Sequence, residues 1–183
     1  MSLIVIGYRI LVPFTMLRWP VAGIFLAIIA DASDAMIFEA TGWGLFGGQG
    51  GINYSYWDKG LDLWYLFFAW LAVQKFWTEP LARTTASVLF WWRLAGVVLF
   101  FLWPHRIVFT LAPSIFENFY ILWSVSRKWF PSFAKSAAER PKQFIAILLI
   151  AALPKIAQEM MMHWFFENQT WEFFRTYIFW WLY

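Results

Sequence analysis

Two apolar stretches decide the fold: residues 21–41 read VAGIFLAIIADASDAMIFEAT, and residues 58–77 read DKGLDLWYLFFAWLAVQKFW. Each is close to the roughly 20 residues that a helix needs to cross the hydrocarbon core of a bilayer. Between them, residues 42–57, GWGLFGGQGGINYSYW, are rich in glycine and aromatic side chains. That composition is typical of a loop that ends at a membrane interface. The stretch therefore predicts two membrane spans joined by a loop.

The composition of the whole chain indicates the same class of protein. Of its 183 residues, 62% are hydrophobic and only 14% are charged, which lies outside the usual range for a soluble domain. We therefore expect one all-α, polytopic transmembrane domain over residues 1–183. The absence of cysteine excludes disulfides and thiolate metal sites. Membrane lipids are the expected surroundings, and no nucleic-acid partner is expected.

The apolar pattern along the chain predicts five spans, with an interfacial helix at each end. The predicted spans cover about residues 21–41, 58–77, 86–103, 107–124 and 143–165. Residues 3–17 are apolar but short and are interrupted by Arg9 and Pro13, which favours a helix lying in the interface. Residues 171–183 are almost wholly aromatic and too short to span, so we expect them in the opposite interface. Pro113 predicts a kink in the fourth span.

The basic residues of alternate loops predict the orientation. One side of the membrane receives Arg9, Arg18, Lys75, Arg83, Arg127, Lys128, Lys135, Arg140 and Lys142, and the other side receives Lys59, Arg106 and Arg175. The side richer in cations is cytoplasmic as a rule. This predicts a cytoplasmic N-terminus and an extracytoplasmic C-terminus, with the glycine-rich loop outside.

Four carboxylates within the first two spans are the strongest candidate site: Asp31, Asp34, Asp58 and Asp62. A charge in hydrocarbon is costly, so such residues face a protein interior or a wet cavity. Asp31 and Asp34 share one helix face, and so do Asp58 and Asp62. One interpretation is a structural polar network in which Arg93 and Lys155 neutralise some of the carboxylates, because buried charges persist when they are paired.

A second polar stripe lies in the fifth span, where Lys155, Glu159 and His163 recur at intervals of four residues on one helix face. Glu117 is a further charge inside the fourth span. The stripe has two interpretations. One is a proton relay or a metal site of His163, Glu159 and His105, and the other is an intrahelical ladder of ion pairs.

The spacing of Asp31 and Asp34 with Asp58 and Asp62 resembles the acidic pattern of the CDP-alcohol phosphotransferases. The resemblance implies that the four carboxylates hold two divalent cations such as Mg²⁺ and that the last one acts as a base. The chain has Ala35, Phe38 and Glu39 where that family has glycine, alanine and arginine.

The chain also resembles a group of uncharacterised bacterial polytopic membrane proteins. The residues that carry this resemblance are DKGLD at 58–62, Arg93, Arg106, PSIFE at 113–117, Lys155, Gln158, Glu159 and His163. It implies a multi-pass protein of the bacterial cytoplasmic membrane and no particular activity.

Three functions follow as hypotheses. The favoured one is a non-catalytic accessory or scaffold subunit of a larger bacterial membrane complex, such as a respiratory or photosynthetic one. The 15 Trp and 21 Phe residues would then pack against other subunits, or against a lipid, pigment or quinone at the periphery. The alternatives are a divalent-metal phosphotransferase-like membrane enzyme and a small transporter or proton-relay protein.

Overall fold

The computed structural model describes residues 2–41, 52–105, 107–161 and 176. Within these residues the chain is all-α, as expected, with eight α-helices, one 3-10 segment and no strand. The following sequence-based expectations lie outside the described residues: the glycine-rich loop at 42–51, the helix at 171–183 apart from residue 176, and His163, Arg106 and Arg175.

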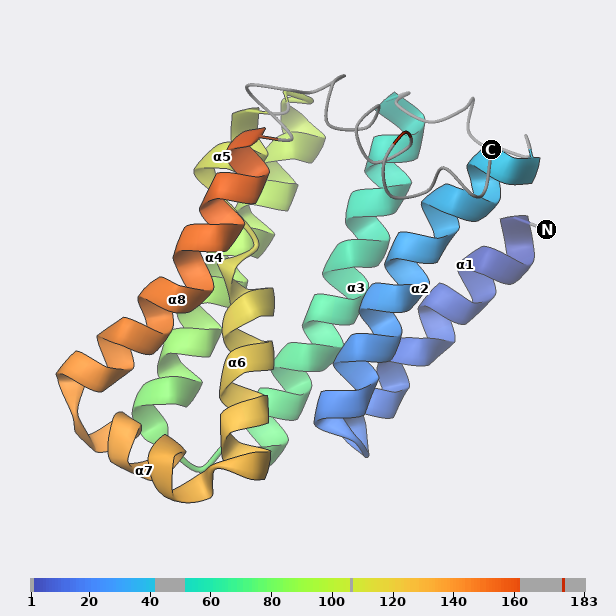
Figure 1. The fold of residues 1–183 in the computed structure, drawn as a ribbon. Helices are drawn as coiled ribbons and strands as arrows, with labels where there is room; N and C mark the ends of the chain where they lie inside the picture. The colour runs from blue at the N-terminus through green and yellow to red at the C-terminus, as the bar shows by residue number, and fades with distance from the viewer. Residues whose placement is uncertain (1, 42–51, 106, 162–175, 177–183) are drawn as a thin grey trace.

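The helices run up and down the bundle, and α7 closes one end (Figure 1). The elements are α1 Ser2–Leu11, η1 Val12–Leu17, α2 Pro20–Thr41, α3 Ile52–Phe76, α4 Pro80–Leu102, α5 Ile107–Leu111, α6 Ile115–Trp129, α7 Pro131–Glu139 and α8 Pro141–Met160. Four of these helices begin at a proline, which fits the first helical turn because no intrahelical partner is needed there for its missing N–H. The helix α3 begins six residues before the predicted start at Asp58.

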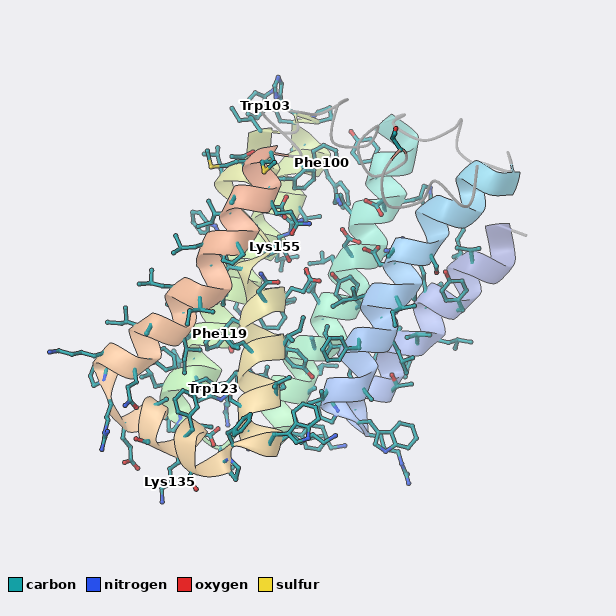
Figure 2. The ribbon with its side chains drawn as sticks, viewed as in Figure 1. Phe100, Trp103, Phe119, Trp123, Lys135 and Lys155 are labelled. Carbon is teal, nitrogen blue, oxygen red and sulfur yellow. The ribbon has the colours of Figure 1, made fainter. Side chains whose placement is uncertain are left out.

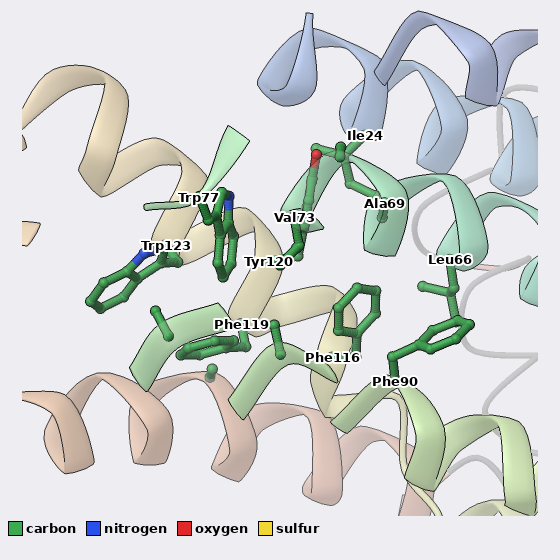
Figure 3. Packing of buried hydrophobic residues seen from close by; sticks show 14 of the residues in the cluster. Ile24, Leu66, Ala69, Val73, Trp77, Phe90, Phe116, Phe119, Tyr120 and Trp123 are labelled. Carbon is green, nitrogen blue, oxygen red and sulfur yellow. The ribbon is translucent and has the colours of Figure 1, made fainter. Parts of the chain in front are cut away.

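The core is aromatic and is built around α6. Phe116, Phe119, Tyr120 and Trp123 are fully buried and follow the spacing of one helix face. Figure 3 shows them between side chains of α3 and α4. The ring of Trp77 stacks on Tyr120 with the centroids 5.8 Å apart. This packing fixes α6 in the middle of the bundle.

Two of the described helices, α4 and α8, are long and apolar enough to cross a membrane by length and composition. The expectation of five spans is therefore not met by this criterion. In α3 the charges Asp58, Lys59 and Asp62 gather within five residues, and α6 has only 15 residues. The apolar part of α2 that the structure describes, Pro20–Ser33, is short as well.

The predicted fourth span is broken rather than kinked. The helix α5 ends at Leu111 and α6 begins at Ile115, with Pro113 between them. Proline lacks the N–H that a helix needs, and it disfavours the helical conformation of the residue before it. The helix α4 approaches the break closely, because a Cβ atom on Gly96 would overlap the Cβ of Ala112.

One end of the bundle collects the cations. The turn before α2, the turn between α3 and α4, and the short helix α7 lie at this end (Figure 1). They carry or adjoin Arg18, Lys75, Arg83, Arg127, Lys128, Lys135, Arg140 and Lys142. We call it the basic end, and Lys135 marks it in Figure 2. That this end faces the cytoplasm stays a prediction.

Arg9, in the N-terminal helix, does not lie where the sequence predicts it. The helix α1 lies lengthwise beside α2 (Figure 1). Arg9 was assigned to the cytoplasmic loops, but it is 4% exposed and points into the bundle toward α2 and α3. A long cationic side chain inside an apolar segment finds its partners among the carboxylates of neighbouring helices.

Candidate functional site: a charged cavity at the helix break

A cavity of about 220 Å³ lies among α2, α3, α4, α6 and α8. Seven acidic or basic side chains line it: Asp31, Lys59, Asp62, Arg93, Glu117, Lys155 and Glu159. Tyr65, Ser114 and Gln158 add further polar groups to its wall. Lys155 lies away from the basic end, partway along the bundle (Figure 2). These residues lie on all five predicted spans, and the fold brings them to one space.

The aspartates are held by two cations, Arg9 and Lys59. The guanidinium of Arg9 pairs with Asp31, with Asp62 at 3.1 Å and with Asp58 at 3.5 Å. The ammonium of Lys59 pairs with Asp58 at 2.8 Å and with Asp62 at 2.9 Å. Because removal from water disfavours a charge, this mutual pairing is what keeps the group stable inside the bundle. We call these five residues the aspartate cluster.

The fourth predicted acid, Asp34, falls on α2. Its side chain lies outside the part of the chain whose burial the structure describes.

The glutamates are held by the other two cations. Lys155 Nζ lies 3.1 Å from Glu117 Oε2, which joins α8 to α6. Arg93 Nη1 lies 3.8 Å from Glu159 Oε1, which joins α4 to α8. The sequence led us to expect Arg93 and Lys155 beside the aspartates, or a ladder within α8. The structure instead shows ion pairs between different helices, because these side chains point inward and meet across the cavity.

The two halves of the site meet at Phe109. The Lys59 ammonium lies 5.5 Å from the centre of its ring, and the Arg93 guanidinium lies 5.0 Å from it. Cations are attracted to the face of an aromatic ring at such distances. The aspartate cluster and the glutamate pairs therefore form one continuous polar interior.

The break between α5 and α6 exposes main-chain groups to this interior. Arg93 Nη1 donates to the carbonyl oxygen of Ala112 at 2.7 Å, and the Ser114 N–H donates to Glu159 Oε1 at 3.4 Å. Two atoms of the cavity-lining residues, Arg93 Nε and Ser114 Oγ, have no hydrogen-bond partner among the residues that the structure describes. Buried polar groups are nearly always paired, so unpaired groups beside a cavity indicate water or a ligand.

His105 does not join the polar interior. It is exposed in the turn after α4, with its ring 5.2 Å from that of Trp103. Glu159 is buried beside Ser114 instead. The predicted combination of His105 with Glu159 is therefore not formed in the described part of the chain.

The aspartate cluster has part of what a divalent cation requires. One carboxylate oxygen each from Asp31, Asp58 and Asp62 lies within 4.8 Å of the other two. Such hard oxygen donors suit Mg²⁺. All three carboxylates are, however, already paired with Arg9, and two of them also with Lys59. The side chains as placed therefore fit a closed ion-pair network and do not fit a magnesium site.

Comparison with known proteins found no matching family model, no matching curated protein and no matching solved structure. Fold and site thus define a class only: an all-α, aromatic-rich bundle with buried charges around a cavity.

Sequence reasoning missed Arg9, Lys59 and Ser114 as site residues. A signal existed for Arg9, because a charge within an apolar run is a functional hypothesis by default. Lys59 directly follows Asp58 and stands three residues before Asp62, which is the spacing of an ion pair on a helix. Ser114 carried no signal beyond its position after Pro113.

Proposed function

We propose that this chain is a multi-pass protein of the bacterial cytoplasmic membrane whose central cavity binds a small polar solute or an ion for transport or proton relay. One observation carries the proposal. Charged side chains from several helices converge on one cavity at a broken helix, and within the described part of the chain Arg93 Nε and Ser114 Oγ have no hydrogen-bond partner there.

The broken helix supports a binding role. In a membrane, irregular backbone is tolerated only where it is buried in protein or lines a cavity. Discontinuous helices are a recurring way to present main-chain groups and helix ends to a solute near the middle of the membrane. Here Ala112 and Ser114 present such groups, and α6 begins beside the cavity.

The balance of charge narrows the class of solute. The described side chains supply five carboxylates, namely Asp31, Asp58, Asp62, Glu117 and Glu159, and four cations, namely Arg9, Lys59, Arg93 and Lys155. The N-terminus of α6 adds about half a positive charge. An interior this close to neutral suits a zwitterionic or neutral polar solute, or a proton, better than a multiply charged anion.

A ligand screen with one substitution tests this proposal. The full-length protein in lipid nanodiscs is heated with small amino acids, polyols and monovalent cations, and a ligand that binds the folded state raises the melting temperature. The Ser114→Ala variant should unfold no more easily than the wild type, because its hydroxyl has no partner, yet it should lose most of the shift caused by the ligand. The control variant Ser126→Ala, buried outside the cavity, should keep the shift. A wild type that responds to none of these solutes, or a Ser114→Ala variant that responds fully, contradicts the proposal.

An accessory subunit of a bacterial membrane complex is the second candidate. The outward face of α4 exposes Val88, Trp91, Trp92 and Leu99, with Trp92 at 56%. Flat apolar faces of this kind suit neighbouring subunits as well as lipid. Gentle detergent extraction tests it, because a subunit copurifies with partners in fixed stoichiometry and a solute-binding protein runs alone.

A divalent-metal phosphotransferase is the third candidate, and the convergence of Asp31, Asp58 and Asp62 favours it. It requires Arg9 and Lys59 to leave the carboxylates when the metal binds. A titration with Mg²⁺ tests this candidate, as described in the Discussion.

A further inference from the structure

A second pocket, of about 510 Å³, opens at the basic end and is separate from the charged cavity. It lies where the turn before α2, the end of α3 and the last turns of α6 meet. We call it the basic pocket. Its cations are Arg18, Arg127 and Lys128, and the first residues of α2 form part of its wall.

The three cations are arranged for a ligand from outside the chain. Arg127 is half-buried, and Glu79 holds its Nε at 3.1 Å. Arg18 and Lys128 are exposed, and each lies over the ring of the tryptophan that follows it, Trp19 at 5.3 Å and Trp129 at 4.9 Å. The glutamate thus fixes one cation, while the other two are positioned by aromatic rings and carry no carboxylate partner among the described ion pairs.

Neutral hydrogen-bond donors add to the cations. The helix α2 starts at Pro20, so the main-chain N–H groups of Val21 and Ala22 and the positive end of the helix dipole lie at the pocket wall. Helix N-termini bind anions, phosphate groups above all, for these two reasons. Ser124 also lines the pocket and is 5% exposed, and its Oγ has no hydrogen-bond partner among the described residues.

The rest of the wall is apolar. Val21, Phe76 and Trp77 contribute to it. Trp19 lines the pocket and is 57% exposed, and Trp129, which follows the lining residue Lys128 in the chain, is 55% exposed. Exposed aromatic residues of this kind are typical of the level of lipid headgroups. A phosphate ligand that also has apolar chains therefore matches this pocket better than a phosphate free in water.

We propose that the basic pocket binds the phosphate group of an anionic phospholipid from the adjoining leaflet. The phosphate oxygens accept hydrogen bonds from Arg18, Arg127 and Lys128, and the glycerol and the first methylene groups lie against Val21 and Trp77. Basic pockets between helices at the cytoplasmic surface are the usual sites for such headgroups. The proposal needs only that the basic end meets a membrane surface, and it does not depend on what the charged cavity binds.

The experiment uses the full-length protein in detergent, titrated with a short-chain phosphatidylglycerol and, in parallel, with phosphatidylcholine. Bound lipid is counted by native mass spectrometry. The variants Arg18→Gln and Lys128→Gln each remove one exposed cation of the pocket. Lys135→Gln is the matched control, because Lys135 is exposed on α7 at the same end but does not line the pocket.

We expect one phosphatidylglycerol to bind in preference to phosphatidylcholine, and each pocket variant to weaken its binding by about five-fold, since one cation near a lipid surface contributes about that much. Lys135→Gln should leave the binding unchanged. Equal weakening by Lys135→Gln, or no preference between the two lipids, would overturn the proposal. Inorganic phosphate and glycerol phosphate form a third arm. If either competes with phosphatidylglycerol at equal concentration, the ligand is a soluble phosphate compound and the lipid assignment is wrong.

Discussion

Arg93 on α4 and Ala112, the residue directly after α5, are joined by a hydrogen bond of 2.7 Å from the guanidinium to the main-chain carbonyl oxygen. The carbonyl is one that a continuous helix would have satisfied and that the break at Pro113 leaves open. Arg93 is only 3% exposed, so an arginine supplied by a neighbouring helix replaces the missing helical bond. The irregular segment is thereby part of the packed interior.

The pair of Arg93 and Glu159 should behave as a coupled unit. Removing one member leaves the other charge buried without its partner, which typically costs about 3–5 kcal/mol. We expect Arg93→Met and Glu159→Gln each to lower the free energy of unfolding strongly, and the double variant to lose less than the sum of the two. Unfolding in mixed micelles measures all four proteins. Additive losses would show that the two side chains act independently, in contradiction to their distance of 3.8 Å.

Two glycines of long helices should respond in opposite ways to alanine. A Cβ on Gly96 would overlap Ala112, whereas a Cβ on Gly60 has no atom of another element within 4 Å. Gly96→Ala should therefore destabilise the protein by about 1–3 kcal/mol through overpacking. Gly60→Ala should be neutral, or stabilising by about 0.5–1 kcal/mol, because alanine favours a helix over glycine. Thermal unfolding of the two variants checks both values, and equal effects would argue against the close approach of α4 to the break.

The aspartate cluster should not bind Mg²⁺ while Arg9 and Lys59 are present. Both cations pair with the carboxylate oxygens that a metal would use. Millimolar Mg²⁺ is expected to leave the melting temperature of the wild type unchanged apart from the effect of ionic strength, for which matched NaCl is the control. In Arg9→Gln the carboxylates lose one cation, so Mg²⁺ should raise a melting temperature that the substitution has lowered. Tight Mg²⁺ binding by the wild type would contradict the closed network and favour the phosphotransferase.

The orientation can be measured with single cysteines, because the chain has none of its own. His105 and Lys135 are both exposed. The ring of His105 lies beside that of Trp103, which Figure 2 shows at the opposite end of the bundle from Lys135. We expect a membrane-impermeant maleimide to label His105→Cys in intact spheroplasts and Lys135→Cys only after permeabilisation. The physical reason is that cation-rich segments are retained in the cytoplasm. The reverse labelling pattern would place the basic end outside the cell and would contradict the predicted orientation.

The helices were predictable because their signals are local. Apolar runs predicted both ends of α2, the end of α4 and the start of α8 to within two residues. The start of α4 was predicted less well, because α4 begins at Pro80, six residues before the predicted start at residue 86. The gathering of Asp31, Asp58 and Asp62 was also predictable, since acids within apolar segments turn inward.

The partners of these acids were not predictable in the same way. Arg9 stands 22 residues before Asp31 and 53 residues before Asp62, so no spacing in the sequence connects them. Which cation meets which carboxylate depends on the packing of α1 against α2 and α3. The break at Pro113 was only partly predictable. The sequence shows that Pro113 lacks an N–H, but it does not show that Gly96 faces Ala112 and gives the broken segment room against α4.

The start of α6 at Ile115 couples the conformation of this segment to the charges of the cavity. If residues 107–129 straightened into one helix, Ala112 and Ser114 would be withdrawn from Arg93 and Glu159, and the partial positive charge at the start of α6 would move away from the carboxylates. The conformation of residues 107–129 and the charges of the interior are therefore linked. A solute that neutralises Glu159 would favour the straight helix, and its release would restore the break.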